Sequence, residues 1–144
     1  MLDFDDPEEL VGVVLDQRWR LARVVGQGGL GVVYEAHGPT GEVRAIKILR
    51  REFCDETEIV DRFLSEVKAS ARVDHPGLAS VYEAVRAADG TPYLVMELIA
   101  GQTLAHRMNR GRVSVEQAKG LVISLLQALA TAHPLGVVHR DLKP

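Results

Sequence analysis

Cysteine is nearly absent from this chain of 144 residues, which limits the chemistry it can perform. Its single cysteine, Cys54, cannot form an internal disulfide, and no cysteines and histidines are paired at the spacing of a zinc site. The amino terminus, MLDFDDPEEL, is acidic where a secretory signal peptide is basic and then apolar. We therefore expect a cytoplasmic protein whose present segment holds no metal ligands.

Excess positive charge and long apolar runs are also missing. The formal net charge is −3, whereas nucleic-acid-binding proteins carry a basic surface that neutralises phosphates. The most apolar stretch, residues 121–132, contains Ser124 and Gln127 and is shorter than the roughly 20 residues that cross a bilayer. We expect neither a nucleic-acid partner nor membrane contact in this segment. The hydrophobic content of 47% suffices for the core of one globular domain.

Short runs rich in β-branched and aromatic residues predict an antiparallel sheet. Residues 1–18 form an acidic lead-in, and the first ten of them indicate a solvated segment. Three strand-like runs follow, RWRLARVV, GVVYEA and EVRAIKIL, and two more come later, LASVYEAV and TPYLVMEL. The sequence HGPTG between the second and third runs predicts a hairpin turn. We expect five strands in all.

One long helix is predicted between the third and fourth strands. Over residues 57–73, apolar side chains recur every four positions, as one face of a helix requires, at Ile59, Phe63, Val67 and Ala71. The proline in His75-Pro76-Gly77 disfavours helix before it. The helix is therefore expected to end ahead of that tripeptide.

Helical patterns return after Ile99. A short helix is predicted from about Thr103, and a longer one covers residues 115–135. Ser114 stands at the position of an N-cap, and Gln117 follows three residues later, as in a capping box.

A glycine-rich segment, GQGGLGVV at residues 26–33, matches the pattern G-x-G-x-x-G-x-V. Such glycines let the backbone turn tightly and approach phosphate oxygens. In dinucleotide-binding domains a similar pattern opens a helix, whereas strand residues follow it here. A P-loop is excluded because no Gly-Lys-Ser/Thr follows Gly31. Alone, the segment fits a hairpin without a ligand equally well.

Ala45 and Lys47 share one face of the third strand, and a small residue beside a lysine suits a ligand. Combined with the stretches GQGGLGVVYEA, DHPGLASVYE and HRDLKP, this Ala-Ile-Lys resembles the protein kinase family. The bacterial serine/threonine kinases of eukaryotic type are the most similar group. The resemblance runs over residues 11–144.

This resemblance implies an α+β, protein-kinase-like fold whose catalytic domain is incomplete. Residues 19–96 would form the N-terminal lobe, a five-stranded antiparallel sheet with one long helix. A hinge would follow at residues 97–102. Residues 103–144 would be the first helices of a helical C-terminal lobe and would end in the catalytic loop.

ATP would be the cofactor. Lys47 would hold its α- and β-phosphates and would itself be held by a helix carboxylate. Glu66 is the candidate, because a helical wheel places it beside the apolar stripe. Glu58 points away from that stripe, and Glu56 belongs to the first turn, where a carboxylate serves the helix dipole.

Further nucleotide contacts are implied by the same resemblance. Val33 and Ala45 would cover the adenine, Met96 would close the back of the pocket, and backbone groups of Glu97 and Ile99 would bind the adenine edge. The loop around the phosphates would consist of Val25, Gly26, Gln27, Gly28, Gly29, Leu30 and Gly31.

The terminal HRDLKP is implied to carry catalysis. Asp141 would be the base that accepts the proton of the substrate hydroxyl, and Lys143 would steady the transferred phosphate, which favours serine or threonine as acceptor. Arg140 would pair with a phosphorylated activation loop. The magnesium ligands, an Asn and the Asp of a DFG motif, are expected after Pro144.

The leading hypothesis is an ATP-dependent serine/threonine protein kinase that phosphorylates protein hydroxyls. Because the 144 residues lack the magnesium ligands, we expect little activity from them alone. Exposed apolar helix faces after Ile99 would favour self-association. A pseudokinase-like nucleotide-binding or regulatory module is the alternative, and a nonfunctional remnant without cooperative unfolding is the third.

Overall fold

The computed structural model describes residues 2, 6–70, 72–138 and 142. The chain divides into two compact units. The first comprises Met1–Ala71 and Ala79–Leu98 and contains the sheet, and the second comprises Arg72–Leu78 and Ile99–Pro144.

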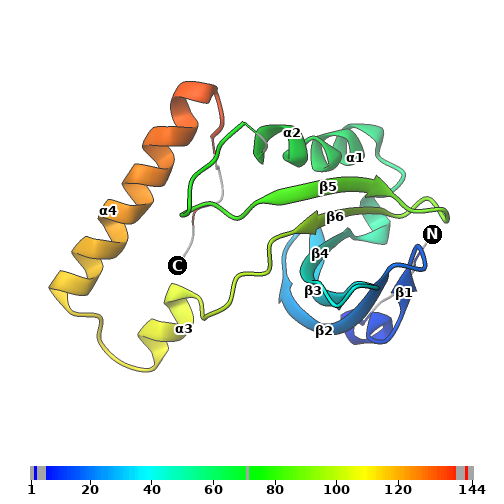
Figure 1. Cartoon of the computed structure of the whole chain (residues 1–144), viewed down its shortest axis with the longest axis horizontal. Helices are drawn as coiled ribbons and strands as arrows, with labels where there is room; N and C mark the ends of the chain where they lie inside the picture. The colour runs from blue at the N-terminus through cyan, green and yellow to red at the C-terminus, as the bar shows by residue number, and fades with distance from the viewer. Residues whose placement is uncertain (1, 3–5, 71, 139–141, 143–144) are drawn as a thin grey trace. The chain divides into compact units, whose positions relative to one another are not determined.

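A six-stranded antiparallel sheet forms the first unit (Figure 1). Its strands, in spatial order, are β1 (Val14–Leu15), β2 (Trp19–Gln27), β3 (Gly31–His37), β4 (Val43–Leu49), β6 (Pro92–Met96) and β5 (Val81–Arg86). All five predicted strands are present, and β1 is an addition that the sequence pattern did not reveal. The predicted HGPTG turn joins β3 to β4, with Gly41 at a φ of 88°, where glycine is favoured.

Alternation along β4 separates two hydrophobic cores on opposite faces of the sheet. Ile46 and Ile48 point into the first core, and Leu49 points into the second. The first core contains Leu10, Leu15, Trp19, Leu21, Val32, Tyr34, Ala36, Ile46, Ile48, Ala87, Tyr93 and Val95. The second consists of Leu49, Cys54, Val60, Phe63 and Leu94.

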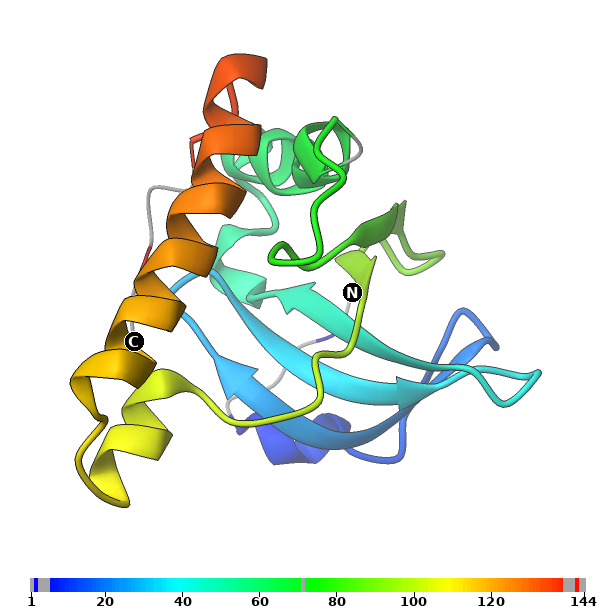
Figure 2. The same cartoon turned by 60° about the vertical axis from the view of Figure 1, so that its left-hand side comes forward.

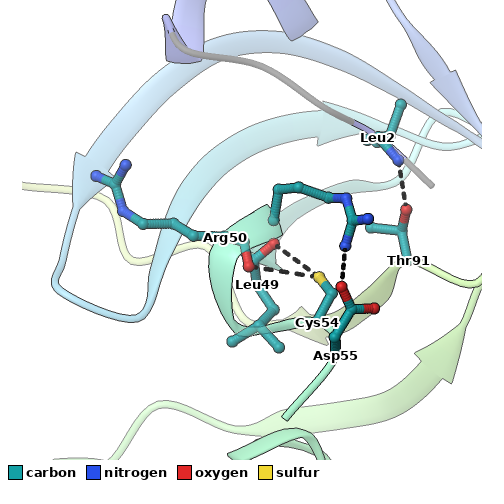
Figure 3. Close-up of polar contacts among 7 residues, drawn as sticks. Leu2, Leu49, Arg50, Cys54, Asp55 and Thr91 are labelled. Carbon is teal, nitrogen blue, oxygen red and sulfur yellow. Dashed lines mark hydrogen bonds and ion pairs between the residues drawn. The ribbon is translucent and has the colours of Figure 1, made fainter.

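The amino-terminal segment takes part in the first core, contrary to the expectation of a solvated lead-in. Leu10 ends the 3₁₀ helix η1 (Pro7–Leu10) and is 5% exposed. The buried Tyr34 hydroxyl donates to the Pro7 carbonyl at 2.8 Å. The Leu2 N–H donates to the Thr91 hydroxyl, also at 2.8 Å (Figure 3). The prediction relied on the acidic composition of this segment and overlooked the few apolar residues that anchor it.

The sheet is strongly curved, so that the turn after β1 reaches the hairpin between β5 and β6 (Figure 2). Asp16, in the left-handed region at a φ of 47°, accepts hydrogen bonds from the Ala88 N–H at 3.1 Å and the Tyr93 hydroxyl at 2.9 Å. Arg18 forms an ion pair with Glu83 of β5. These contacts join parts of the chain more than 60 residues apart.

The predicted long helix is two shorter ones, α1 (Thr57–Leu64) and α2 (Glu66–Ser70), which lie beside β6 and β5 (Figure 1). Ser65 separates them, and its hydroxyl donates to the Arg62 carbonyl at 2.7 Å. A serine that bonds its own helix backbone competes with the helical hydrogen-bond pattern. The apolar period contained no sign of this break.

The second unit contains α3 (Leu104–Asn109), α4 (Val115–Ala132) and the 3₁₀ turn η3 (His133–Leu135). The predicted capping box is confirmed, because the Ser114 hydroxyl accepts from the Gln117 N–H and the Gln117 side chain accepts from the Ser114 N–H, both at 3.1 Å. Pro134 lies in η3, where the α-helix has ended.

Apolar side chains remain exposed along α4, including Val115, Leu121, Val122, Ile123, Leu125 and Leu126. Within the part of the chain that the structure describes, no helix is both long enough and apolar enough to cross a membrane.

Candidate nucleotide-binding site

An ion pair between Lys47 of β4 and Glu66 of α2 marks the candidate site. The Lys47 Nζ lies 3.1 Å and 3.0 Å from the two carboxylate oxygens of Glu66. The predicted partner and the lysine are thus in contact. The lysine side chain is 24% exposed and the glutamate 41%, so the pair sits at the surface of the first unit with access to solvent.

Packing holds this pair in place from the helix side. Phe63, at the end of α1, is 1% exposed, and the Lys47 Nζ lies 5.3 Å from the centre of its ring. The break at Ser65 starts α2 with Glu66. An ammonium group above an aromatic face and beside a carboxylate is held in position by both contacts.

Three apolar residues lie near Lys47 on the same face of the sheet. Strand register places Val33 opposite Lys47 and Met96 opposite Ala45, and residues paired in this way share a face. Ala45 is 5% exposed, and Val33 and Met96 are half-buried. The three residues predicted to surround adenine therefore form one strip that ends at the lysine.

The glycine-rich loop, residues 26–31, joins β2 to β3 as predicted. It is closed by a hydrogen bond from the Gly28 N–H to the Gly31 carbonyl at 2.8 Å. A Cβ at Gly31 would lie 2.5 Å from the Ile48 carbonyl oxygen, so only glycine fits there. Val25 and Leu30 are 43% and 39% exposed, and they flank the loop with apolar surface.

Arg50 contacts the loop, and the sequence reasoning did not identify it. Its backbone N–H donates to the Leu30 carbonyl at 3.0 Å, and its side-chain Nε donates to the Gly28 carbonyl at 3.3 Å. The only signal available beforehand was a basic residue three positions after Lys47 at the end of a strand. Nothing in that spacing indicates that the loop folds back to it.

The residues predicted for the hinge fall on either side of the boundary between the units. The Glu97 N–H donates to the Ser80 carbonyl at 2.8 Å, and its carboxylate accepts from the Ser80 N–H at 3.1 Å. Both the backbone N–H and the side chain of Glu97 are therefore paired with Ser80. Ile99 belongs to the second unit and is 62% exposed.

The candidate catalytic residues Asp141 and Lys143 lie outside the described residues, as do His139 and Arg140. In the described part of the chain, no three or more His, Cys, Asp or Glu side chains are grouped to hold a metal ion. The residues present there do not fit a magnesium site. The chemistry that the described residues support is the binding of an anionic ligand with an apolar portion.

Comparison with known proteins agrees with this geometry. The family model described as "Protein kinase domain" matches residues 19–144, most of the chain. The chain belongs to the protein kinase family. Its resemblance to the bacterial serine/threonine kinases of eukaryotic type is likewise confirmed by the relatives found.

Three bacterial relatives illustrate the similarity. The serine/threonine-protein kinase PknA of Mycobacterium tuberculosis is 41% identical over 140 residues, which cover 93% of this chain and 32% of PknA. Pkn3 of Myxococcus xanthus is 37% identical over 147 residues, 96% of this chain and 26% of Pkn3. PkaB of Streptomyces coelicolor is 39% identical over 132 residues, 90% of this chain and 31% of PkaB.

The kinase fold is confirmed by a solved structure. The kinase domain of Mycobacterium tuberculosis PknI superimposes with a TM-score of 0.75 at 26% identity, and the match covers 93% of this chain and 55% of PknI's. The protein kinase segment described here therefore spans about a third of its curated relatives and about half of the solved kinase domain.

Proposed function

We propose that this chain is the ATP-binding part of a serine/threonine protein kinase that transfers the γ-phosphoryl group of ATP to a protein hydroxyl. The observation that carries the proposal is the Lys47–Glu66 ion pair at the end of an apolar strip. A lysine held by a helix carboxylate is the arrangement that positions ATP phosphates in protein kinases. The names of the bacterial relatives support the same activity.

ATP would lie along the strip. Val33, Ala45 and Met96 would contact the adenine, and the Glu97 carbonyl and the Ile99 backbone would bind its edge. Lys47 would bind the α- and β-phosphates as a cation that is held in place by Glu66. The loop that covers the phosphates would comprise Val25, Gly26, Gln27, Gly28, Gly29, Leu30 and Gly31.

Phosphoryl transfer would depend on the end of the chain. Asp141 would accept the hydroxyl proton, and Lys143 would contact the transferred phosphate. Magnesium neutralises the phosphates in this family, but the described residues do not form its site. We therefore expect the 144 residues alone to transfer phosphate at a background rate. The same proposal includes a protein substrate with a serine or threonine acceptor. It also includes self-association of the kinase domain and a cytoplasmic location.

The boundaries predicted from the sequence remain part of this proposal, with the N-terminal lobe at residues 19–96, the hinge at 97–102 and the start of the C-terminal lobe at 103–144. The alternative function is a pseudokinase-like module that binds nucleotide without transfer. The hydrogen-bonded Lys47 and the closed glycine-rich loop suit either function, because both require a nucleotide site.

A thermal melt of the 144-residue chain, with and without magnesium ATP, tests nucleotide binding. A ligand that binds only the folded state stabilises it by about 2.7 kcal/mol at a hundredfold excess over Kd. We expect an upward shift that disappears in Lys47→Ala. Lys68→Ala is the matched control, because Lys68 is exposed on the neighbouring α2 and should leave the shift unchanged.

A cooperative melt without a shift would contradict nucleotide binding by this chain. A shift that survives in Lys47→Ala would contradict the assigned site. The remnant hypothesis requires that no cooperative transition exists at all. A parallel transfer assay with radiolabelled ATP should stay at background, and robust transfer by the 144 residues would refute the expected inactivity.

A further inference from the structure

We propose that Arg50 is a positioning residue that orients a peptide group of the glycine-rich loop toward the phosphates. This inference rests on the proposed nucleotide-binding function and adds to it a residue outside the predicted site. Arg50 would not touch the nucleotide. It would act through the peptide that joins Gly28 to Gly29.

Arg50 holds the loop at two points on either side of Gly29. Its Nε donates to the Gly28 carbonyl at 3.3 Å, and its backbone N–H donates to the Leu30 carbonyl at 3.0 Å. Gly29 itself has open space around the position of a Cβ, so side-chain packing does not fix it. The conformation of the loop tip therefore depends on these hydrogen bonds and on the Gly28–Gly31 closure.

The backbone of Arg50 is in turn fixed to the frame of the first unit. Its carbonyl accepts from the Phe53 N–H at 3.0 Å, at the end of the 3₁₀ helix η2 (Arg51–Phe53). The Cys54 thiol donates to the same carbonyl at 3.4 Å. In Figure 3 the Arg50 side chain extends away from Cys54. The loop is thus connected to η2 and the second core through one residue.

The face of the sheet from which Arg50 contacts the loop determines where the Gly29 N–H points. Lys47 and Leu49 share one face of β4, and the extended backbone at Arg50, with a φ of −65° and a ψ of 145°, continues the alternation. The Arg50 side chain therefore leaves the strand on the face opposite to Lys47. Within a trans peptide the C=O and the following N–H point in opposite directions. Because Arg50 holds the Gly28 carbonyl, the Gly29 N–H is directed away from the arginine.

An N–H directed to the lysine side would donate to a phosphate oxygen, whereas a carbonyl turned there would repel it. Without the guanidinium, this peptide is free to rotate, since glycines on both sides leave its conformation unrestricted. We therefore expect the loss of Arg50 to weaken the binding only of ligands that carry phosphate groups. Adenosine, which lacks them, should bind to the Arg50 variants as it does to the unaltered chain.

The test compares Arg50→Ala, Arg50→Lys and Arg51→Ala in the 144-residue chain. Arg51→Ala is the matched control, because it removes an adjacent guanidinium that bonds Asp55 at 3.0 Å instead of the loop. One readout is the ¹⁵N order parameter of the Gly29 amide without nucleotide. The other is the ratio of ATP to adenosine affinity by calorimetry. Equal melting temperatures confirm that each variant is folded.

In Arg50→Ala we expect the Gly29 order parameter to fall below about 0.6. ATP affinity should fall about tenfold or more, the value of one charge-assisted hydrogen bond, with adenosine affinity unchanged. Arg50→Lys, which keeps a donor and the charge, should recover part of the loss. Arg51→Ala should match the unaltered chain in both readouts.

An unchanged order parameter in Arg50→Ala would overturn the proposal, as would equal losses of ATP and adenosine affinity. If the unaltered chain binds no ATP, the proposed function fails, and the order parameter still decides whether Arg50 orders the loop. A mobile loop with undiminished ATP affinity would also overturn the positioning role.

Discussion

Arg18 and Glu83, 65 positions apart, form a bidentate ion pair that links the turn before β2 to β5 across the curved sheet. The two guanidinium nitrogens lie 2.9 Å and 3.0 Å from the two carboxylate oxygens. The Arg18 guanidinium also lies 4.7 Å from the centre of the Trp19 ring. The paired geometry and the aromatic contact distinguish it from an ordinary surface ion pair.

This pair should contribute a measurable coupling energy to folding. In a double-mutant cycle with Arg18→Ala and Glu83→Ala, we expect a coupling of about 0.5–1 kcal/mol, the upper part of the range for exposed pairs. The coupling should weaken in 1 M salt because exposed charges are screened. Urea unfolding measures it. The exposed pair Arg51 and Asp55 is the comparison, and a coupling equal to theirs would contradict a special role.

Gly31 should tolerate no side chain, in contrast to Gly29. Gly31→Ala would force a Cβ to within 2.5 Å of the backbone oxygen of Ile48, whereas a Cβ at Gly29 meets nothing within 4 Å. We expect Gly31→Ala to destabilise the first unit by about 1–3 kcal/mol, as overpacking does. Gly29→Ala should change the melting temperature little. Equal effects would show that loop flexibility, and not the approach to β4, requires glycine at position 31.

Tyr34 should make folding sensitive to alkaline pH. Burial raises the pKa of Tyr34 from its ordinary value of 10.0 to about 12. The folded state therefore favours the neutral phenol, so this contribution to stability is complete below pH 10 and is lost as the pH rises through 12. Tyr34→Phe should flatten the decline of stability between pH 10 and 12, at a cost of about 1 kcal/mol at neutral pH for the lost bond to Pro7.

The control for that experiment is Tyr82→Phe, which alters a tyrosine that is 47% exposed. It should leave the alkaline decline as it is. Burial and the Asp16 carboxylate also raise the pKa of Tyr93, so a residual decline is expected in Tyr34→Phe. An identical pH profile in the unaltered chain and Tyr34→Phe would contradict the prediction.

Glu66→Gln should separate nucleotide binding from folding. The glutamine keeps the shape of the side chain but removes the charge that holds Lys47. Because the pair is partly exposed, we expect a stability change of less than about 1 kcal/mol. ATP affinity should fall about three- to tenfold. Titration with a fluorescent ATP analogue measures it, with Glu58→Gln, an exposed change in α1, as control. The assignment fails if both variants bind equally well.

Periodicity and turn residues predicted most of the fold. The five long strands, the HGPTG turn and the Ser114 capping box each depend on local preferences, which sequence alone displays. The helical wheel identified Glu66 as the partner of Lys47 for the same reason, because the face of a helix on which a residue lies follows from its spacing. Their roles toward ATP remain predictions.

Contacts between distant segments were beyond that reasoning. The strand β1 has two residues, too few for a period, and Leu10 joins the first core only because the sheet curves. The break at Ser65 depends on one hydroxyl that turned back to the Arg62 carbonyl. Arg50 meets the Gly28 carbonyl through the path of the loop in space, which no local pattern encodes.

The anchored amino-terminal segment has a practical consequence for anyone who produces this protein. The family match starts at residue 19, which invites a recombinant protein that begins there. That cut removes Leu10 and Leu15 from the first core, takes the Pro7 carbonyl from the Tyr34 hydroxyl, and takes the Leu2 N–H from the Thr91 hydroxyl. A recombinant form that begins at Trp19 should aggregate or melt early. The cloning boundary belongs ahead of Leu2.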